Sequence, residues 1–260
     1  MSQHIHYDVS EGIATITIDR PEKRNALSYE MYDAIRDHAM EADADPSIGA
    51  IILTAVPGQF CAGTDLTELR DVAPGTKPED REGHTDGRHW FFWECNTPVI
   101  AAVDGPAAGL GVELLTQCDL RIASTQARFS WIFVQRGLIP DTGAGTWLLP
   151  QIVGAQQAKR LVFSGEFIDA VEARDIGFLL DVVEPEQLQQ AARELAKRVS
   201  TGSPYAIARA KSLLNWASSR GRDEHLHEHI KAMTECQTSE DHKEGVAAFL
   251  ERRPARFTGR

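Results

Sequence analysis

Two carboxyl side chains stand where an acid or a base could act on a bound molecule. Glu113 lies among Val112, Leu114 and Leu115, in the first turn of an expected helix. Apolar surroundings penalise the charged carboxylate and raise its pKa toward neutrality, which suits general acid–base catalysis. Asp141 lies in a later glycine-containing bend. It is either a second acid or base or a helix N-cap, and its local sequence favours the cap.

Two loops of small residues could supply hydrogen-bond donors to the same site. They span residues 62–64 (AGT) and 109–111 (GLG), and each follows an apolar strand and precedes an expected helix. A helix start has unpaired N–H groups at the positive end of its dipole, and glycine lets the backbone approach a ligand closely. Two such N–H groups aimed at one carbonyl oxygen form an oxyanion hole. Either loop alone would be an ordinary tight turn, whereas the pair favours chemistry at a carbonyl group.

The elements that must carry these residues alternate between strand and helix up to about residue 185. The apolar runs 48–55 and 98–103 predict strands buried on both faces, and residues 12–19 alternate as a strand does. This order indicates an α/β fold with largely parallel strands. Residues 105–111 are expected to form a loop, and residues 73–87, rich in Pro, Gly and charge, a mobile loop. The last part of the chain has helical periodicity.

The composition excludes several classes of partner. The chain has 260 residues, a formal net charge of −11, 42% hydrophobic residues and 25% charged residues, typical of a globular protein of one or two domains. An acidic chain of this kind is not expected to bind nucleic acid or an anionic membrane. Four cysteines without a CxxC pair indicate reduced thiols in a cytoplasmic protein. Neither a signal peptide nor an apolar run of membrane-spanning length is evident.

Six segments together resemble the crotonase (enoyl-CoA hydratase/isomerase) superfamily. They follow one another in the family's order along nearly the whole chain: 20–27 (RPEKRNAL), 60–66 (FCAGTDL), 98–105 (PVIAAVDG), 109–114 (GLGVEL), 137–147 (GLIPDTGAGTW) and 252–257 (RRPARF). The resemblance implies an α/β fold built as a crotonase-type spiral of ββα units. It implies a core over residues 1–200 that holds the site, and a C-terminal helical oligomerisation region over residues 201–260. The expected assembly is a homotrimer or homohexamer.

The same resemblance implies a substrate and the residues that hold it. The substrate is a coenzyme A thioester of an acyl group, with no bound cofactor and no metal. The N–H groups of Thr64 and Leu110 are expected to hold the thioester oxygen while an enolate forms. The coenzyme A moiety is expected along Arg24, Ala26, Ala62, Asp65 and Leu66, with Phe257 contributed by a neighbouring subunit. Gly109, Trp131 and Phe133 are expected at the acyl group, and the aromatic cluster 90–93 either joins them or packs in the core.

The reaction within the family depends on where the acid and base groups lie. Hydratases resemble one another in having two glutamates; Glu113 matches the first, but Phe133 occupies the position of the second. Asp141 resembles the acid/base residue of ring-epoxide and Δ3,Δ2-type enoyl-CoA isomerases. The sequence therefore predicts an enoyl-CoA isomerase-type proton shift. The alternatives are an enoyl-CoA hydratase, then a dehalogenase, thioester hydrolase or C–C hydrolase, and, outside enzymes, a non-catalytic binding or structural subunit.

Two further patterns bear on the alternatives. The dehalogenase would need a histidine base and a tryptophan; His84 and His89 lie in the right region, but the tryptophan is absent. His225, Glu228 and His229 share a helix face at a spacing that can bind zinc. No further ligand stands near them in the sequence, so a solvated or subunit-facing surface is favoured.

Overall fold

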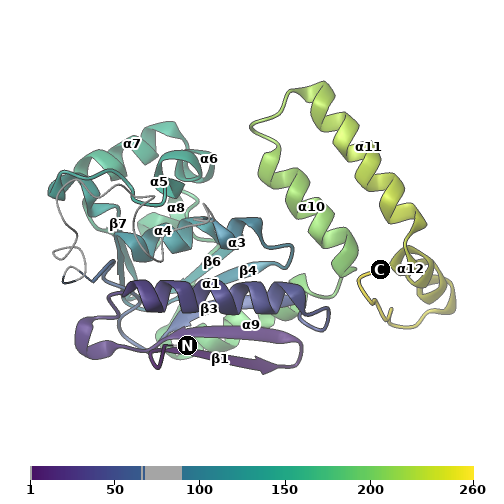
Figure 1. Cartoon of the computed structure of the whole chain (residues 1–260), viewed down its shortest axis with the longest axis horizontal. Helices are drawn as coiled ribbons and strands as arrows, with labels where there is room; N and C mark the ends of the chain where they lie inside the picture. Colours follow the sequence, from purple (N-terminus) through teal and green to yellow (C-terminus); the bar gives the residue numbers. More distant parts are fainter. Residues whose placement is uncertain (1, 66, 68–89) are drawn as a thin grey trace.

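The computed structural model describes residues 2–65, 67 and 90–260, and a six-stranded sheet forms its centre (Figure 1). The strand order is β1-β2-β3-β4-β6-β9, in which β1 is antiparallel to β2 and each later pair is parallel. The apolar runs predicted as buried strands are β3 and β4, every residue of which is buried. The strands are β1 (Ile5–Ser10), β2 (Ile13–Ile18), β3 (Ala50–Ala55), β4 (Val99–Val103), β6 (Leu120–Ser124) and β9 (Asp181–Val183).

A second, smaller sheet brings the two glycine loops together. It consists of β5 (Pro106–Ala108), β7 (Arg128–Ser130) and β8 (Ile168–Asp169), in that order. Isolated bridges Cys61–Ala107 and Leu27–Thr64 extend the pairing toward the N-terminal half of the chain. The prediction of a loop over residues 105–111 is therefore wrong for most of its length, because Pro106–Ala108 form β5 and helix α4 (Leu110–Gln117) begins at Leu110. A three-residue strand is too short to show a period of two, and its register comes from β7 and Cys61 rather than from local sequence.

Helices cover both faces of the main sheet. Helix α1 (Tyr29–Ala44) begins after the predicted cap Ser28, whose hydroxyl accepts a hydrogen bond from the Met31 N–H at 3.2 Å. It contacts β1 and β2, and α9 (Leu188–Val199) packs on β2, β3, β4 and β6 with a separate apolar cluster. The remaining elements before residue 200 are η1 (Pro21–Lys23), α3 (Phe91–Glu94), α4 (Leu110–Gln117), η3 (Ile132–Arg136), α5 (Ala144–Trp147), α6 (Leu149–Val153), α7 (Ala155–Ser164), α8 (Ala170–Asp175) and η4 (Pro185–Gln187).

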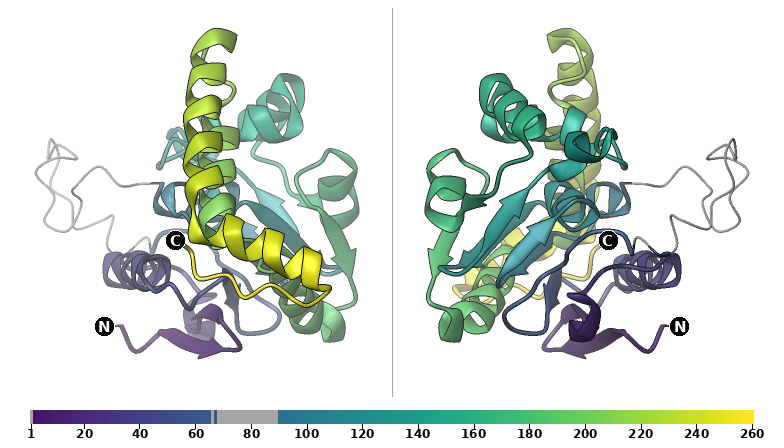
Figure 2. Two further views of the ribbon diagram at one scale, coloured as in Figure 1. Left: turned by 90° about the vertical axis from the view of Figure 1, so that its right-hand side faces the viewer. Right: turned by 90° about the vertical axis from the view of Figure 1, so that its left-hand side faces the viewer.

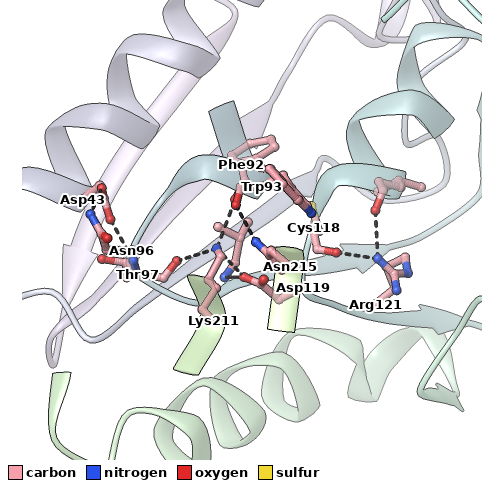
Figure 3. A network of polar contacts seen from close by, with 12 residues as sticks. Asp43, Phe92, Trp93, Asn96, Thr97, Cys118, Asp119, Arg121, Lys211 and Asn215 are labelled. Carbon is pink, nitrogen blue, oxygen red and sulfur yellow. Dashed lines mark hydrogen bonds and ion pairs between the residues drawn. The ribbon is translucent and has the colours of Figure 1, made fainter. Parts of the chain in front are cut away.

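Three helices complete the chain and extend away from the sheet (Figures 1 and 2). They are α10 (Pro204–Trp216), α11 (Arg222–Thr238) and α12 (Glu240–Glu251). Ser239 separates the last two and caps α12, accepting from the His242 N–H at 3.0 Å. Helix α10 is attached to the core by Lys211, whose ammonium group reaches Asp119 at 2.7 Å (Figure 3).

All four cysteines are unpaired. Cys61, Cys95 and Cys118 are buried free thiols and Cys236 is half-buried. Within the described part of the chain, none of the helices has the length and apolar character needed to cross a membrane. The loop predicted over residues 73–87, which includes His84, lies outside the described residues, and so does His89.

Candidate active site

The two glycine loops lie against each other at the start of α4. Gly109 precedes the helix with φ 53° and ψ −126°, and Gly63 has a φ of 108°; both are conformations that side chains disfavour. A Cβ atom added to Gly63 would lie 3.6 Å from the Leu110 nitrogen, and one added to Gly109 would lie 3.7 Å from the Gly63 Cα. The predicted pair of loops is thus a single structural unit.

Two N–H groups in this unit remain available to a ligand. Among the described residues, the N–H groups of Thr64 and Leu110 donate no hydrogen bond within the protein. The loop around Thr64 is nevertheless fixed, because the Leu27 N–H donates to the Gly63 carbonyl and the Asp65 N–H to the Leu27 carbonyl, both at 2.8 Å. Preorganised donors of this kind can stabilise charge on a carbonyl oxygen without reorganising.

Glu113 lies in the first turn of α4 with no exposed surface. Its Oε2 accepts a hydrogen bond from the Thr142 hydroxyl at 2.7 Å, while its Oε1 has no partner among the described residues. Burial raises the pKa of Glu113 to about 7, and the hydrogen bond from Thr142 opposes that rise. A carboxyl group with this pKa exchanges protons readily near neutral pH.

Space for this carboxyl group exists because residue 145 is a glycine. A Cβ atom at Gly145 would collide with Glu113 Oε1 and would lie 3.0 Å from Trp131 Cδ1 and 3.1 Å from Pro140 Cβ. The bend that contains Pro140 and the first turn of α5 therefore packs directly on the carboxyl group. Gly145 is a functional position that sequence reasoning missed.

Asp141 lies in the same bend and is not a helix cap. The residue that precedes α5 is Gly143, and no side chain caps that helix, so the N-cap interpretation of Asp141 is wrong. Asp141 is an exposed residue, yet desolvation by the surrounding protein raises its pKa to about 6.

Electrostatic coupling indicates that Asp141 and Glu113 share one region. The negative charge of Asp141 contributes to the raised pKa of Glu113. Burial is the largest cause of the raised pKa of Tyr32. The negative charge of Asp141 raises that pKa further, and the charge of Glu113 adds a smaller rise. Tyr32 extends from α1 and packs edge-on against Phe91, with ring centroids 5.5 Å apart. Thr142 and Tyr32 are further residues of the site that the sequence analysis did not single out; the only sequence signal was that Thr142 adjoins Asp141.

The residues expected along coenzyme A fall into two groups. Arg24 and Ala62 are exposed and Ala26 is half-buried, and the Ala62 N–H donates to the Arg24 carbonyl at 3.1 Å. Asp65 is buried, and its carboxylate is engaged by Arg20 at 3.0 Å and by the Thr67 hydroxyl at 2.7 Å. These hydrogen bonds hold the pKa of Asp65 below its ordinary value. The Asp65 side chain therefore stabilises the loop, and Leu66 lies outside the described residues.

The C-terminal segment lies elsewhere in the single chain. Phe257 packs on α12, where a Cβ atom at Gly245 would lie 3.5 Å from the Phe257 ring. Figure 1 shows α12 and the C-terminus on the side of the molecule away from α4 and α5. Arg253 is neutralised by Glu244 and Glu251, with N–O distances of 2.6 Å. Phe257 thus does not meet Arg24 within one chain.

The aromatic residues expected at the acyl group are buried. Trp131 has no exposed surface and Phe133 has 6%, while Phe91, Phe92 and Trp93 belong to the apolar clusters of the core. Trp90 differs, because it is half-buried and its indole N–H donates to the Thr142 carbonyl at 2.8 Å. The aromatic cluster therefore packs chiefly as core and touches the site through Trp90.

No arrangement of three or more His, Cys, Asp or Glu side chains that could hold a metal ion occurs among the described residues. His225 and His229 lie on α11 in the C-terminal region. Near α4, the structure places two carboxyl groups and two backbone donors.

Backbone donors beside a buried carboxyl group are an arrangement suited to enzymes that act on carbonyl compounds. Comparison with known proteins gives the family. The family model for enoyl-CoA hydratase/isomerase matches residues 8–260, and the chain belongs to this family. It is 34% identical over 265 residues to 1,2-epoxyphenylacetyl-CoA isomerase of Escherichia coli, covering 100% of both chains. It is 36% identical over 244 residues to short-chain-enoyl-CoA hydratase of Clostridium acetobutylicum, covering 93% of this chain and 92% of the relative.

A solved structure confirms the fold. The crystal structure of enoyl-CoA hydratase from Bacillus anthracis superposes with a TM-score of 0.91 at 28% identity, covering 99% of this chain and 100% of that one. The predicted crotonase-type α/β fold with a helical C-terminal region is therefore confirmed.

Proposed function

We propose that this protein is an enoyl-CoA isomerase that moves a proton along the acyl chain of a coenzyme A thioester. The observation that carries the proposal is the pair of carboxyl groups on either side of Thr142. Asp141 precedes this threonine in the chain, and Glu113 accepts a hydrogen bond from the threonine hydroxyl at 2.7 Å. The relative from Escherichia coli, named as an isomerase, supports the same reaction class.

The backbone donors stabilise negative charge on the substrate. The N–H groups of Thr64 and Leu110 bind the thioester oxygen. Both donors stabilise the charge that develops on this oxygen when a proton leaves the acyl chain. Removing one donor from such a site typically costs about 100- to 1,000-fold in rate. The bound intermediate is a dienolate, which accepts a proton at a carbon other than the one that lost it.

The two carboxyl groups divide the proton transfers according to their pKa values. Because the pKa of Asp141 is about 6 and that of Glu113 about 7, the populated state between these values has Asp141 ionised and Glu113 protonated. Asp141 is then the base that removes the proton, and Glu113 is the acid that returns one. The rate should follow a bell-shaped pH profile that falls below about 6 and above about 7.

Hydration of a 2-enoyl-CoA is the second candidate, favoured by the hydratase named among the relatives. Against it stands Phe133, which is buried in η3 where hydratases are expected to carry a second glutamate. A phenyl ring neither donates nor accepts a proton, so it cannot help to position the attacking water. Dehalogenase, thioester hydrolase and C–C hydrolase activities rank behind these two.

Coenzyme A is proposed to lie across the exposed Arg24 and Ala62 and the half-buried Ala26, at the edge where the 62–64 loop meets the loop before α1. Arg24 offers a positive charge to the phosphates of this polyanionic ligand. Phe257 joins this site only from a neighbouring subunit, so the proposal includes assembly as a homotrimer or homohexamer.

The test uses Asp141→Asn and Glu113→Gln with a 3-enoyl-CoA substrate, whose conversion to the conjugated 2-enoyl-CoA raises ultraviolet absorbance. Each variant is expected to lose kcat by about 100-fold or more, the usual contribution of a general acid or base. Wild-type kcat in both variants would contradict the proposed mechanism.

Two controls separate the alternatives. Fast hydration of 2-enoyl-CoA that survives Asp141→Asn would identify a hydratase instead. Calorimetric titration with acyl-CoA esters addresses the non-catalytic alternative, because a chain that binds no coenzyme A ester is not an enzyme of this family's kind.

A further inference from the structure

Helix α10 is bonded to carbonyl groups of the short helix α3. Lys211 is 8% exposed, and its ammonium group donates to the Phe92 carbonyl at 3.1 Å, to the Thr97 carbonyl at 3.2 Å and to Asp119 at 2.7 Å. One turn further along α10, the Asn215 side chain donates to the Trp93 carbonyl at 2.8 Å. Figure 3 shows both side chains reaching from α10 to α3. The carbonyls of the two middle residues of α3, Phe92 and Trp93, therefore accept hydrogen bonds from α10.

Packing reinforces this connection. Trp93 packs edge-to-face on Trp216 of α10, with ring centroids 4.7 Å apart. It also forms a buried cluster with Ala144 of α5 and with Leu148, which lies between α5 and α6. A helix of four residues has almost no stability of its own, so its position is set by the elements that contact it. Helix α3 is thus held between α10 and the start of α5.

The opposite end of α3 contacts the active-site bend. Trp90 precedes the helix, packs edge-to-face on Trp93 at 5.7 Å and donates its indole N–H to the Thr142 carbonyl at 2.8 Å. The hydroxyl of the same threonine donates to Glu113 at 2.7 Å and accepts from the Ala144 N–H at 3.2 Å. Thr142 therefore accepts a hydrogen bond from Trp90 at its backbone carbonyl and donates one to Glu113 from its side chain.

We propose that α10 positions the carboxyl group of Glu113 through α3, so that Asn215 and Trp90 are positioning residues of the active site. Neither side chain needs to touch the substrate. Asn215 and Lys211 hold α3 in place, and Trp90 then holds the carbonyl group of Thr142. The orientation of Thr142 determines the geometry of the hydrogen bond from its hydroxyl to Glu113. The C-terminal helices are in this way part of the catalytic architecture and not only a surface for assembly.

The inference rests on the role proposed for Glu113, but its test needs no turnover. The pKa of Glu113 is measured in the whole protein with 13C-labelled glutamate by NMR, and its signal is assigned by its loss in Glu113→Gln. The Thr142 hydroxyl stabilises the ionised form of Glu113, so loosening it raises the pKa. Trp90→Phe and Asn215→Ala are each expected to raise it by about half a pH unit, the size expected for a weakened hydrogen bond. The double variant should shift it no further than the larger single change, because both act along one path.

Matched controls separate positioning from general loosening. Trp147→Phe removes a half-exposed indole from α5, and Ser212→Ala removes an exposed hydroxyl from α10; neither side chain forms a hydrogen bond among the described residues. Both should leave the titration of Glu113 unchanged. A pKa of Glu113 that stays at its wild-type value in Trp90→Phe, or in Asn215→Ala, would overturn the inference. A protein that titrates as expected but turns over no enoyl-CoA ester would count against the proposed function and not against this connection.

Discussion

At the scale of single residues, the site keeps a carboxyl group where burial makes its charge costly. Glu113 has no exposed surface, one oxygen bonded to Thr142 and the other unpaired among the described residues. A raised pKa in the folded state means that the folded protein holds a proton that the unfolded chain releases. The contribution of this group to the free energy of unfolding is fully present below the ordinary glutamate pKa. It is lost as the pH rises through about 7.

This linkage predicts that Glu113→Gln stabilises the protein at alkaline pH. Glutamine keeps the size and an acceptor for Thr142 but carries no charge, so it removes the penalty for burying a carboxylate. The gain over wild type should be about 2–3 kcal/mol larger at pH 8 than at pH 4.5, the amount that a shift from the ordinary pKa to about 7 represents. Urea denaturation at the two pH values measures it. Equal differences at both pH values would mean that Glu113 is not buried with a raised pKa.

At the scale of elements, the sequence predicted best where a long pattern reports one environment. The apolar runs gave β3 and β4, and Ser28 marked the start of α1. The second sheet could not be found in this way, because β5 has three residues and depends on pairing with β7. The same limit applies to the site. Glu113 was found from its apolar neighbours, whereas Trp90, Thr142 and Gly145 come together only through packing of α3 and α5 on α4.

The contact between α4 and the chain at Cys61 gives an element-scale prediction. A Cβ atom at Gly111 would lie 2.7 Å from both the Cβ atom and the carbonyl oxygen of Cys61. Gly111→Ala must therefore push α4 away from the loop that carries Thr64. We expect a loss of about 1–3 kcal/mol in the free energy of unfolding, with a fall in kcat because the two backbone donors separate.

The matched control is another helical glycine. A Cβ atom at Gly245 in α12 would lie 3.5 Å from its nearest neighbour, which is ordinary contact. Gly245→Ala should be neutral or stabilise the protein by up to about 1 kcal/mol, since alanine is the better helix former. Chemical denaturation compares the two variants, and equal stability of both would show that α4 does not pack as closely on Cys61 as described.

At the scale of the whole molecule, two features of the single chain point beyond it. The formal net charge of −11 opposes the polyanionic ligand proposed for this protein, so the proposed binding has to depend on local groups such as Arg24. The C-terminal arginines are partly used within the chain, since Arg253 pairs with Glu244 and Glu251. The helices that precede them, α11 and α12, also expose apolar side chains, which a chain that remained alone would leave in water.

These exposed side chains form stripes and predict the surface through which copies assemble. Leu226, Ile230 and Met233 recur at helical spacing on α11 with 47%, 64% and 47% of their surface exposed, and Phe249 on α12 exposes 82%. Ile230→Glu places a charge in the stripe and should convert the assembled protein to single chains at micromolar concentration. His227→Glu adds a similar charge outside the stripe and should leave the assembly intact. Light scattering after size-exclusion chromatography measures both masses. A wild-type protein that elutes as a single chain, or an Ile230→Glu variant that keeps the wild-type mass, would contradict assembly through this face of α11.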